Sequence, residues 1–173
     1  MNLAEVIDFA TQAHDDLGRY RVTNTILAPQ HITFDAYAVS HLHWQSVRYQ
    51  DTDLQKVPDN RKGVYAFTIR EDSQVLPPHG YVLYIGAAGI TSGRSLRDRY
   101  GDYRTPQKIL KRSKIAMMIG TWHEVLQFMF APVDHDFTTA ELKELEKQLN
   151  TALLPPYSQQ DLHATVRRQR RAF

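Results

Sequence analysis

The sequence predicts an α+β fold: a small three-stranded antiparallel sheet flanked by helices, with an N-terminal helical extension. Two observations lead to this prediction. Residues 63–158 alternate between short β-branched or aromatic runs and helical stretches, in the order strand, strand, helix, helix, strand, helix. The first two strands follow each other across a turn-rich connection, which is typical of a hairpin. A mixture of this kind favours a layered arrangement with a small sheet.

The N-terminal part of the chain has one clear element. Residues 3–17 have the spacing of an amphipathic helix, and Gly18 follows as a C-terminal stop. Residues 19–50 have mixed strand-like and short helical character, and residues 51–62 are polar enough to predict a loop. We therefore expect residues 1–60 to form an N-terminal extension of unassigned role, residues 61–160 to form the main domain, and residues 161–173 to form a basic C-terminal tail.

Three segments have strand character. Residues 63–69 and 81–85 are rich in β-branched and aromatic side chains, and the turn-rich residues 71–80 join them. The glycine-rich residues 86–93 lead out of the second strand as a loop. Residues 123–133 alternate apolar and polar side chains, which predicts the third strand.

Three helices are predicted between and after these strands. Ser95 is a good N-cap for a helix that runs toward Tyr103. Pro106 suits the first turn of a second helix that continues to about Met118. Residues 140–153 form the last helix, with Thr138 or Thr139 as its cap and Pro155 and Pro156 as its end.

Composition limits the classes of function. The 173-residue chain contains no cysteine, which excludes disulfides, thiolate catalysis and thiolate zinc sites. No apolar stretch approaches the roughly 18 residues that span a bilayer, and the first residues lack the pattern of a signal peptide. We therefore expect a cytoplasmic protein without a membrane partner.

The distribution of charge says more than the net charge of +2. Basic residues gather in one internal segment and at the C-terminus: Arg94, Arg97, Arg99, Arg104, Lys108, Lys111, Arg112, Lys114, Arg167, Arg168, Arg170 and Arg171. Such runs are typical of surfaces that bind nucleic acid, although a solvated helix face has the same appearance.

Several motifs lie on the predicted strands and helices in a fixed order. Gly63-Val64-Tyr65 and Tyr84-Ile85-Gly86 occupy the first two strands. Leu96 precedes Arg99 by three positions on the next helix, and Tyr103 follows four positions later. Glu146 stands on the last helix, ahead of Pro156-Tyr157-Ser158. In these motifs and their order, residues 63–158 resemble the GIY-YIG nuclease superfamily. The chain departs from the family pattern at Ala87, where relatives often have lysine, at Ser158, where they have asparagine, and in its longer loop before Leu96.

The resemblance implies a GIY-YIG-like fold and a metal-dependent endonuclease that hydrolyses phosphodiester bonds, with DNA as the expected nucleic acid. In this interpretation the catalytic residues are Tyr65, Tyr84, Arg99, Tyr103 and Glu146. Tyr65 takes a proton from the attacking water, Tyr84 orients the water or the phosphate, and Arg99 clamps the phosphate while keeping the pKa of Tyr65 low. Glu146 is the expected ligand of one Mg²⁺ or Mn²⁺, because Mg²⁺ accepts a single carboxylate and keeps its waters.

The remaining expected contacts lie on the substrate side of the site. They are Arg94, Arg97, Arg104, Ser158 and the tail residues Arg167, Arg168, Arg170 and Arg171. The arginines are expected to bind phosphates without reading bases, and the hydroxyl of Ser158 stands in part for the family's asparagine.

Two other functions stay open from the sequence. One is a catalytically weak nucleic-acid-binding module on the same fold, because a fold does not fix a function. The other is a nuclease that acts on RNA or on structured junctions. Taken singly, each proposed catalytic residue also has an ordinary structural explanation: the tyrosines as half-buried strand residues, Arg99 as a solvated charge, and Glu146 as an ion-pair partner of Lys143 or Lys147.

Overall fold

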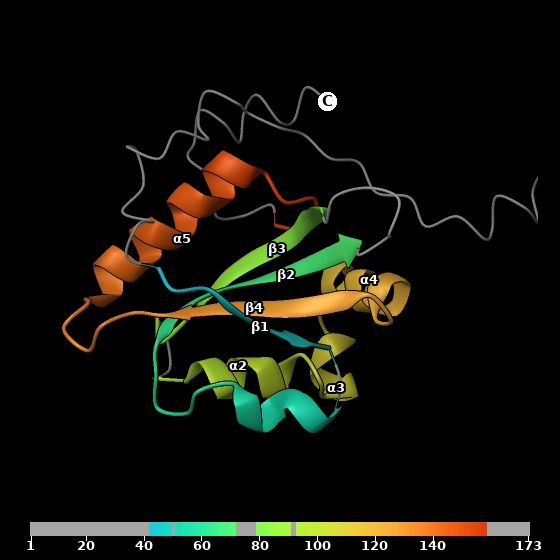
Figure 1. The fold of residues 1–173 in the computed structure, drawn as a ribbon, viewed down its shortest axis with the longest axis horizontal. Helices are drawn as coiled ribbons and strands as arrows, with labels where there is room; N and C mark the ends of the chain where they lie inside the picture. The colour runs from blue at the N-terminus through green and yellow to red at the C-terminus, as the bar shows by residue number, and fades with distance from the viewer. Residues whose placement is uncertain (1–41, 50, 72–78, 91–92, 159–173) are drawn as a thin grey trace, which may run out of the picture.

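The structure is a computed structural model that describes residues 42–49, 51–71, 79–90 and 93–158. Within these residues, the centre is a four-stranded antiparallel sheet in the order β1-β4-β2-β3 (Figure 1). The strands are β1 (Gln45–Arg48), β2 (Gly63–Glu71), β3 (His79–Ala88) and β4 (Leu126–Pro132). The sheet is flanked by a 3-10 helix, η4 (Asp51–Lys56), and by α2 (Leu96–Asp102), α3 (Pro106–Ile109), α4 (Ser113–Trp122) and α5 (Thr139–Leu153). The α+β class is therefore confirmed.

The expected number of strands was wrong. Strand β1 adds a fourth member to the sheet by pairing with β4, from Gln45 opposite Phe130 to Arg48 opposite Gln127. Of its four residues, Val47 alone is buried, so the sequence carries almost no alternation from which this strand can be recognised. The helix predicted for residues 3–17 lies outside the described residues.

The hairpin prediction is confirmed, and β2 pairs with β4 on its other side. Two other predictions of secondary structure were wrong. The single helix expected over residues 106–118 is broken at Arg112, whose backbone has φ −128° and ψ 84°. This break lets Ile109 and Ile115 pack against the same core. Residues 51–56, expected as a loop, form η4.

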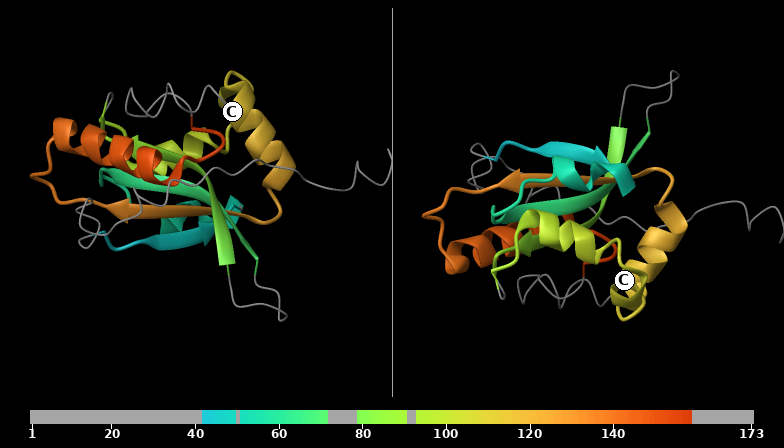
Figure 2. Two further views of the ribbon diagram at one scale, coloured as in Figure 1. Left: turned by 90° about the horizontal axis from the view of Figure 1, so that it is seen from above. Right: turned by 90° about the horizontal axis from the view of Figure 1, so that it is seen from below.

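Helices cover both faces of the sheet. Helix α5 lies across one face and α2 across the other, while α4 lies at the end where β4 begins (Figures 1 and 2). The α5 face is aliphatic, with Val64, Ile85 and Leu142 in one cluster. The α2 face is rich in aromatic side chains, including Tyr65, Phe67, Tyr100, Tyr103 and Phe128. The sheet therefore separates an aliphatic layer from an aromatic one.

The helix starts follow the predicted caps. Ser95 Oγ accepts a hydrogen bond from the Asp98 amide at 3.1 Å, and the Asp98 carboxylate accepts one from the Ser95 amide at 3.0 Å. Hydrogen bonds from the backbone and the side chain of Ser95 lower the pKa of the Asp98 carboxyl. Thr138 and Glu141 form the same reciprocal cap at the start of α5. Because each cap satisfies two of the free amides at a helix start, the positions of α2 and α5 are fixed locally.

Among the residues that the structure describes, each helix is too short or too polar to span a bilayer.

Candidate active site

Three tyrosines from three different elements meet on the aromatic face of the sheet. Tyr65 comes from β2, Tyr84 from β3, and Tyr103 from the residue that ends α2. The hydroxyl oxygens of Tyr65 and Tyr103 are 2.8 Å apart and share a hydrogen bond. Tyr84 lies with its ring centre 6.3 Å from that of Tyr65 and 6.0 Å from that of Tyr103. The two motif tyrosines therefore converge, and Tyr103 joins them.

Tyr84 lies on this face because it pairs with Phe67 in register with Tyr65 and Gly86, and a β-bulge in β3 adds Leu83 beside it. Tyr84 lies opposite Phe67, but Thr68 lies opposite Val82, so Leu83 has no partner on β2. An extra residue in one strand breaks the alternation of side chains and redirects those beside it. As a result, Leu83 and Tyr84 both pack against the aromatic cluster, although they are neighbours in the chain.

Gly86 makes room for the Tyr65 ring. The two residues lie opposite each other in the β2–β3 ladder. A Cβ atom at position 86 would overlap the hydroxyl end of the Tyr65 ring. The glycine of the second motif is thus required by the tyrosine of the first motif, which gives a physical reason for their occurrence together.

Burial raises the pKa of both motif tyrosines. For Tyr65, which is 2% exposed, desolvation by burial is the main cause, followed by the nearby Tyr103 and Tyr84. For Tyr84, burial again comes first, and Tyr103 and the negative charge of Glu146 add to it. Arg99 acts in the opposite direction on the pKa of Tyr65, but its effect is the smallest of the causes. The expectation that Arg99 keeps this pKa low therefore does not hold in the substrate-free protein, where both phenols are neutral.

Two arginines bring positive charge to the tyrosines. Arg99 on α2 is close enough to Tyr65 to act on its pKa. The Nε of Arg99 is buried and has no hydrogen-bond partner among the described residues. A buried donor without an acceptor costs about 1–3 kcal/mol, so this position favours an anion that supplies the acceptor.

The second arginine, Arg112, was not among the predicted site residues. Its guanidinium carbon lies 4.4 Å from the centre of the Tyr103 ring, and its charge lowers the pKa of Tyr84. In the sequence it belongs only to a general basic run and to none of the motifs described above. A break between two helices, which the sequence did not predict, brings it to the site.

Glu146 reaches the site from the opposite layer. It is half-buried on α5, and its negative charge raises the pKa of Tyr84, which shows that the two side chains are near each other. No group of three or more metal-ligating side chains occurs among the described residues. A single carboxylate beside a phosphate site still fits Mg²⁺, which retains most of its waters in such sites. The donor set is therefore compatible with the expected cation.

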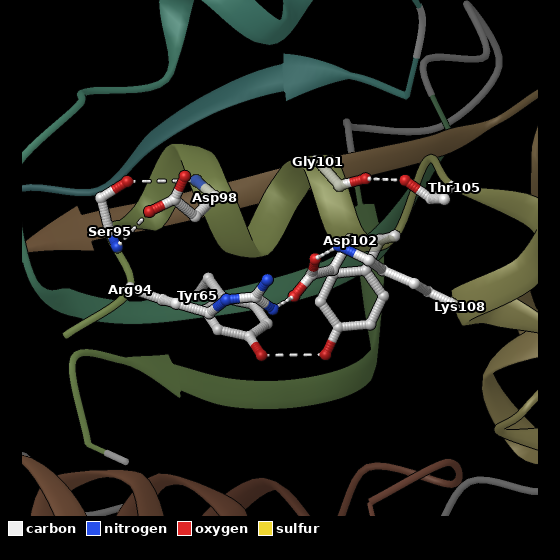
Figure 3. A network of polar contacts seen from close by, with 9 residues as sticks. Tyr65, Arg94, Ser95, Asp98, Gly101, Asp102, Thr105 and Lys108 are labelled. Atoms are coloured by element: carbon white, nitrogen blue, oxygen red, sulfur yellow. Dashed lines mark hydrogen bonds and ion pairs between the residues drawn. The ribbon is translucent and has the colours of Figure 1, made fainter. Parts of the chain in front are cut away.

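Two of the predicted phosphate-binding arginines are engaged within the protein. Arg94 forms an ion pair with Asp102, which is 6% exposed and also binds Lys108 Nζ at 2.6 Å (Figure 3). Arg97 binds Asp59 at 3.2 Å and donates to the Val57 carbonyl at 2.8 Å. These contacts hold α2 to its neighbouring segments.

The other predicted substrate contacts have different surroundings. Arg104 lies over the Tyr100 ring, 5.7 Å from its centre. Ser158 is buried, and its hydroxyl accepts a hydrogen bond from the Ile85 amide at 2.9 Å and donates one to the Ile85 carbonyl at 3.3 Å. The structure thus gives Ser158 a role in holding β3. Arg167, Arg168, Arg170 and Arg171 lie outside the described residues.

Comparison with known proteins gives no match: no protein-family model, curated protein or solved structure is significantly similar to this chain.

Proposed function

We propose that this protein is a metal-dependent endonuclease of the GIY-YIG type that hydrolyses phosphodiester bonds, with DNA as its substrate. The observation that carries the proposal is the convergence of Tyr65, Tyr84 and Tyr103 with Arg99 and with a carboxylate from another layer, Glu146. Phosphodiester hydrolysis needs a positioned water, positive charge at the phosphate and a cation. Each of these requirements has a residue of the right chemistry here.

The arginines bind the scissile phosphate in this proposal. Arg99 has a buried N–H that lacks an acceptor, and a non-bridging phosphate oxygen supplies one. Arg112 adds a second positive charge on the Tyr103 side of the cluster. Together they stabilise the charge that develops on the phosphate oxygens, in a site where burial weakens competition from water.

The tyrosines handle the attacking water. Tyr65 accepts a hydrogen bond from that water, and the hydroxyl of Tyr103, 2.8 Å away, orients the Tyr65 oxygen for this task. Burial keeps Tyr65 neutral in the free protein. Its phenol would become a stronger base only where nearby positive charge, from the divalent cation proposed below, lowered its pKa. Tyr84, which is more exposed, orients the water or the phosphate.

Glu146 would hold the divalent cation, Mg²⁺ or Mn²⁺. When bound, the cation supplies neutralisation of the phosphate and a lower pKa for its bound water. A single protein carboxylate would leave the remaining ligands of such a cation to be supplied by phosphate oxygens and water.

A second candidate function is a nucleic-acid-binding module with little or no cleavage activity. The observation that favours it is the deep burial of Tyr65 together with the raised pKa of both Tyr65 and Tyr84. A phenol that stays neutral and shielded from water is a poor proton acceptor. In this alternative the arginines bind phosphate and the tyrosines serve as a rigid aromatic core.

Cleavage assays separate the two functions. Supercoiled plasmid, single-stranded DNA and RNA are each incubated with the full chain in Mg²⁺, in Mn²⁺ and in EDTA. We expect nicking or linearisation of DNA that requires the metal and is lost in Glu146→Gln, while binding of DNA is kept. Lys143→Gln, an exposed change on the same helix, is the matched control and should cleave normally. Binding without cleavage under all conditions would favour the second function, and equal cleavage by Glu146→Gln would remove the metal assignment.

A further inference from the structure

The corner formed by α3 and α4 exposes apolar side chains that the aromatic core does not use. Leu110, which follows α3, is 75% exposed, and Met117 on α4 is 64% exposed. They are the two most exposed large apolar side chains of the described residues. The opposite side of the same corner is well packed, since Ile115, Met118 and Trp122 are buried. The exposed apolar side chains therefore lie on one face of this corner, and the opposite face of α4 is packed into the core.

The same face is strongly basic. Lys111, Arg112 and Lys114 stand between the two apolar residues, and no acidic residue occurs from position 103 to position 123. Within the described part of the chain, the charged side-chain groups of these three residues make no hydrogen bond or ion pair, although the Arg112 guanidinium lies over the Tyr103 ring. Lys108, in contrast, is held by Asp102. The basic side chains are complementary to a polyanion, and the apolar side chains among them are complementary to a polyanion that also has an apolar surface.

This face is continuous with the candidate active site. Arg112 lies between Lys111 and the start of α4, and its guanidinium stacks on Tyr103. A nucleic-acid strand bound at Arg99 and Arg112 would therefore continue onto Lys111 and Lys114. The α4 N-terminus lies at the same corner, and its helix dipole adds to the positive field.

We infer that the α3–α4 corner, defined by Leu110, Lys111, Arg112, Lys114 and Met117, binds nucleic acid next to the scissile phosphate and contacts unstacked bases there. The inference rests on the proposed function for its substrate. Lys111 and Lys114 bind phosphates, and Leu110 and Met117 pack against base faces. In a regular duplex the base faces are covered by stacking, so apolar contacts of this kind select unpaired or distorted segments.

The test measures binding in EDTA, so that metal-dependent cleavage does not intervene. Three probes of equal length are used with the full chain: a regular DNA duplex, a duplex with a single-stranded branch, and a single strand. The variants are Lys111→Ser/Lys114→Ser and Leu110→Ser/Met117→Ser. Lys143→Ser and Val125→Ser are matched controls, because both residues are exposed and lie outside this corner. Thermal melts check that all variants fold.

The two double variants should fail in different ways. Losing Lys111 and Lys114 should weaken binding to all three probes and reduce the slope of log affinity against log salt by about 0.7–0.9 for each lost phosphate contact. Losing Leu110 and Met117 should leave that slope unchanged. It should lower the affinity for the branched probe by about ten-fold, and so remove the preference for that probe over the regular duplex.

The outcomes distinguish this inference from the proposed function. If the wild-type protein cleaves DNA but both double variants bind all probes as it does, the inference is wrong and the function stands. If the variants behave as expected but no metal supports cleavage, the corner binds nucleic acid and the endonuclease proposal fails. Binding to vesicles of anionic lipid, lost with Lys111 and Lys114 in the absence of any DNA binding, would show that the occupant is a membrane surface and would overturn the inference.

Discussion

At the scale of single residues, the site is defined by hydroxyl groups in unusual surroundings. Tyr65 is almost fully buried, yet its hydroxyl is paired with that of Tyr103, a group that is itself 1% exposed. Buried phenols normally have a hydrogen-bond partner, and here the partner is a second tyrosine whose ring also packs against the first. This pairing distinguishes the cluster from a set of ordinary core aromatics.

Removing the Tyr65 hydroxyl tests whether it takes part in cleavage. Tyr65→Phe should reduce the single-turnover cleavage rate by about 10²–10⁴, the usual contribution of a general base. Tyr84→Phe should reduce it by less if Tyr84 only orients water or phosphate. Because Tyr65→Phe also deprives the buried Tyr103 hydroxyl of a partner, we expect a stability loss of about 1 kcal/mol. Tyr81→Phe, which changes a half-exposed residue of β3, is the control for both measurements.

Cleavage by Tyr65→Phe at the wild-type rate would contradict the mechanism even if the endonuclease activity itself were established. Thermal melts of the same preparations separate a chemical effect from a loss of folded protein.

Gly86 gives a second prediction at this scale. Gly86→Ala should push the Tyr65 ring from its position, because the added Cβ overlaps the hydroxyl end of that ring. We expect a loss of stability of about 1–3 kcal/mol, as for other overpacked cores, and a loss of cleavage. Gly120→Ala is the matched control, since a Cβ there meets nothing within 4 Å and alanine favours the exposed helix. Unfolding in urea should show changes of opposite sign in the two variants, and equal stability of Gly86→Ala and wild type would refute this packing argument.

At the scale of elements, β3 depends on the segment that follows α5. Strand β3 is an edge strand, and its outer side is covered by residues 157 and 158. The Tyr157 amide donates to the Leu83 carbonyl at 3.0 Å, and the Ser158 hydroxyl binds both backbone groups of Ile85. These contacts occur at the bulge residue Leu83 and on the other side of Tyr84. The end of α5 therefore stabilises the geometry of the second motif.

Ser158→Ala tests this support. The change removes a hydrogen bond to the buried Ile85 amide and leaves that amide without its side-chain acceptor, so we expect a loss of about 1–3 kcal/mol. Ser113→Ala, at an exposed serine with no side-chain hydrogen bond at the start of α4, should change stability by less than about 0.5 kcal/mol. The free energy of unfolding in urea is the measurement. Indistinguishable values for the two variants would show that the Ser158 hydroxyl does not stabilise β3.

At the scale of the whole molecule, the aromatic layer joins the sheet, α2 and α4 into one core. The ionisation of the tyrosines in this layer is therefore coupled to folding. The pKa of Tyr65 and that of Tyr84 are both raised in the folded protein, chiefly by burial. A phenol whose folded pKa exceeds its unfolded value of about 10 stabilises the fold fully below that pH. The stabilisation is then lost as the pH rises above about 10, because the unfolded chain releases its protons first.

Alkaline unfolding provides the corresponding prediction. The free energy of unfolding should fall as the pH rises from 10 to 11.5, with a contribution that approaches about 1.4 kcal/mol per pH unit from each buried tyrosine. The double variant Tyr65→Phe/Tyr84→Phe removes both groups and should show a shallower decline, although it is less stable at pH 8. Urea unfolding across this range measures the slopes, and absorbance of tyrosinate near 295 nm follows ionisation. Parallel slopes for wild type and variant would mean that these phenols do not titrate abnormally.

Particular residues show how far the sequence reaches. The strands around Tyr65 and Tyr84, the cap at Ser95 and the helix that carries Glu146 were all predicted, because hydrophobic alternation and capping are encoded within a few neighbouring residues. Strand β1 was missed because one buried side chain, Val47, gives no periodic signal, and its position depends on pairing with β4. The break at Arg112 was missed because the residues around it are all compatible with a helix.

By itself, the sequence determined the α+β class and the order of the main elements, and it supplied the residues that we propose to act on phosphate, since these depend on local periodicity and on side-chain type. Tertiary structure alone decided that Tyr103 pairs with Tyr65, that Arg112 joins the cluster, and that Arg94 and Arg97 form ion pairs with Asp102 and Asp59. It also decided the direction of the tyrosine pKa shifts. Burial and charge at a site are sums over residues far apart in the chain, so they become defined only when the layers of the fold pack together.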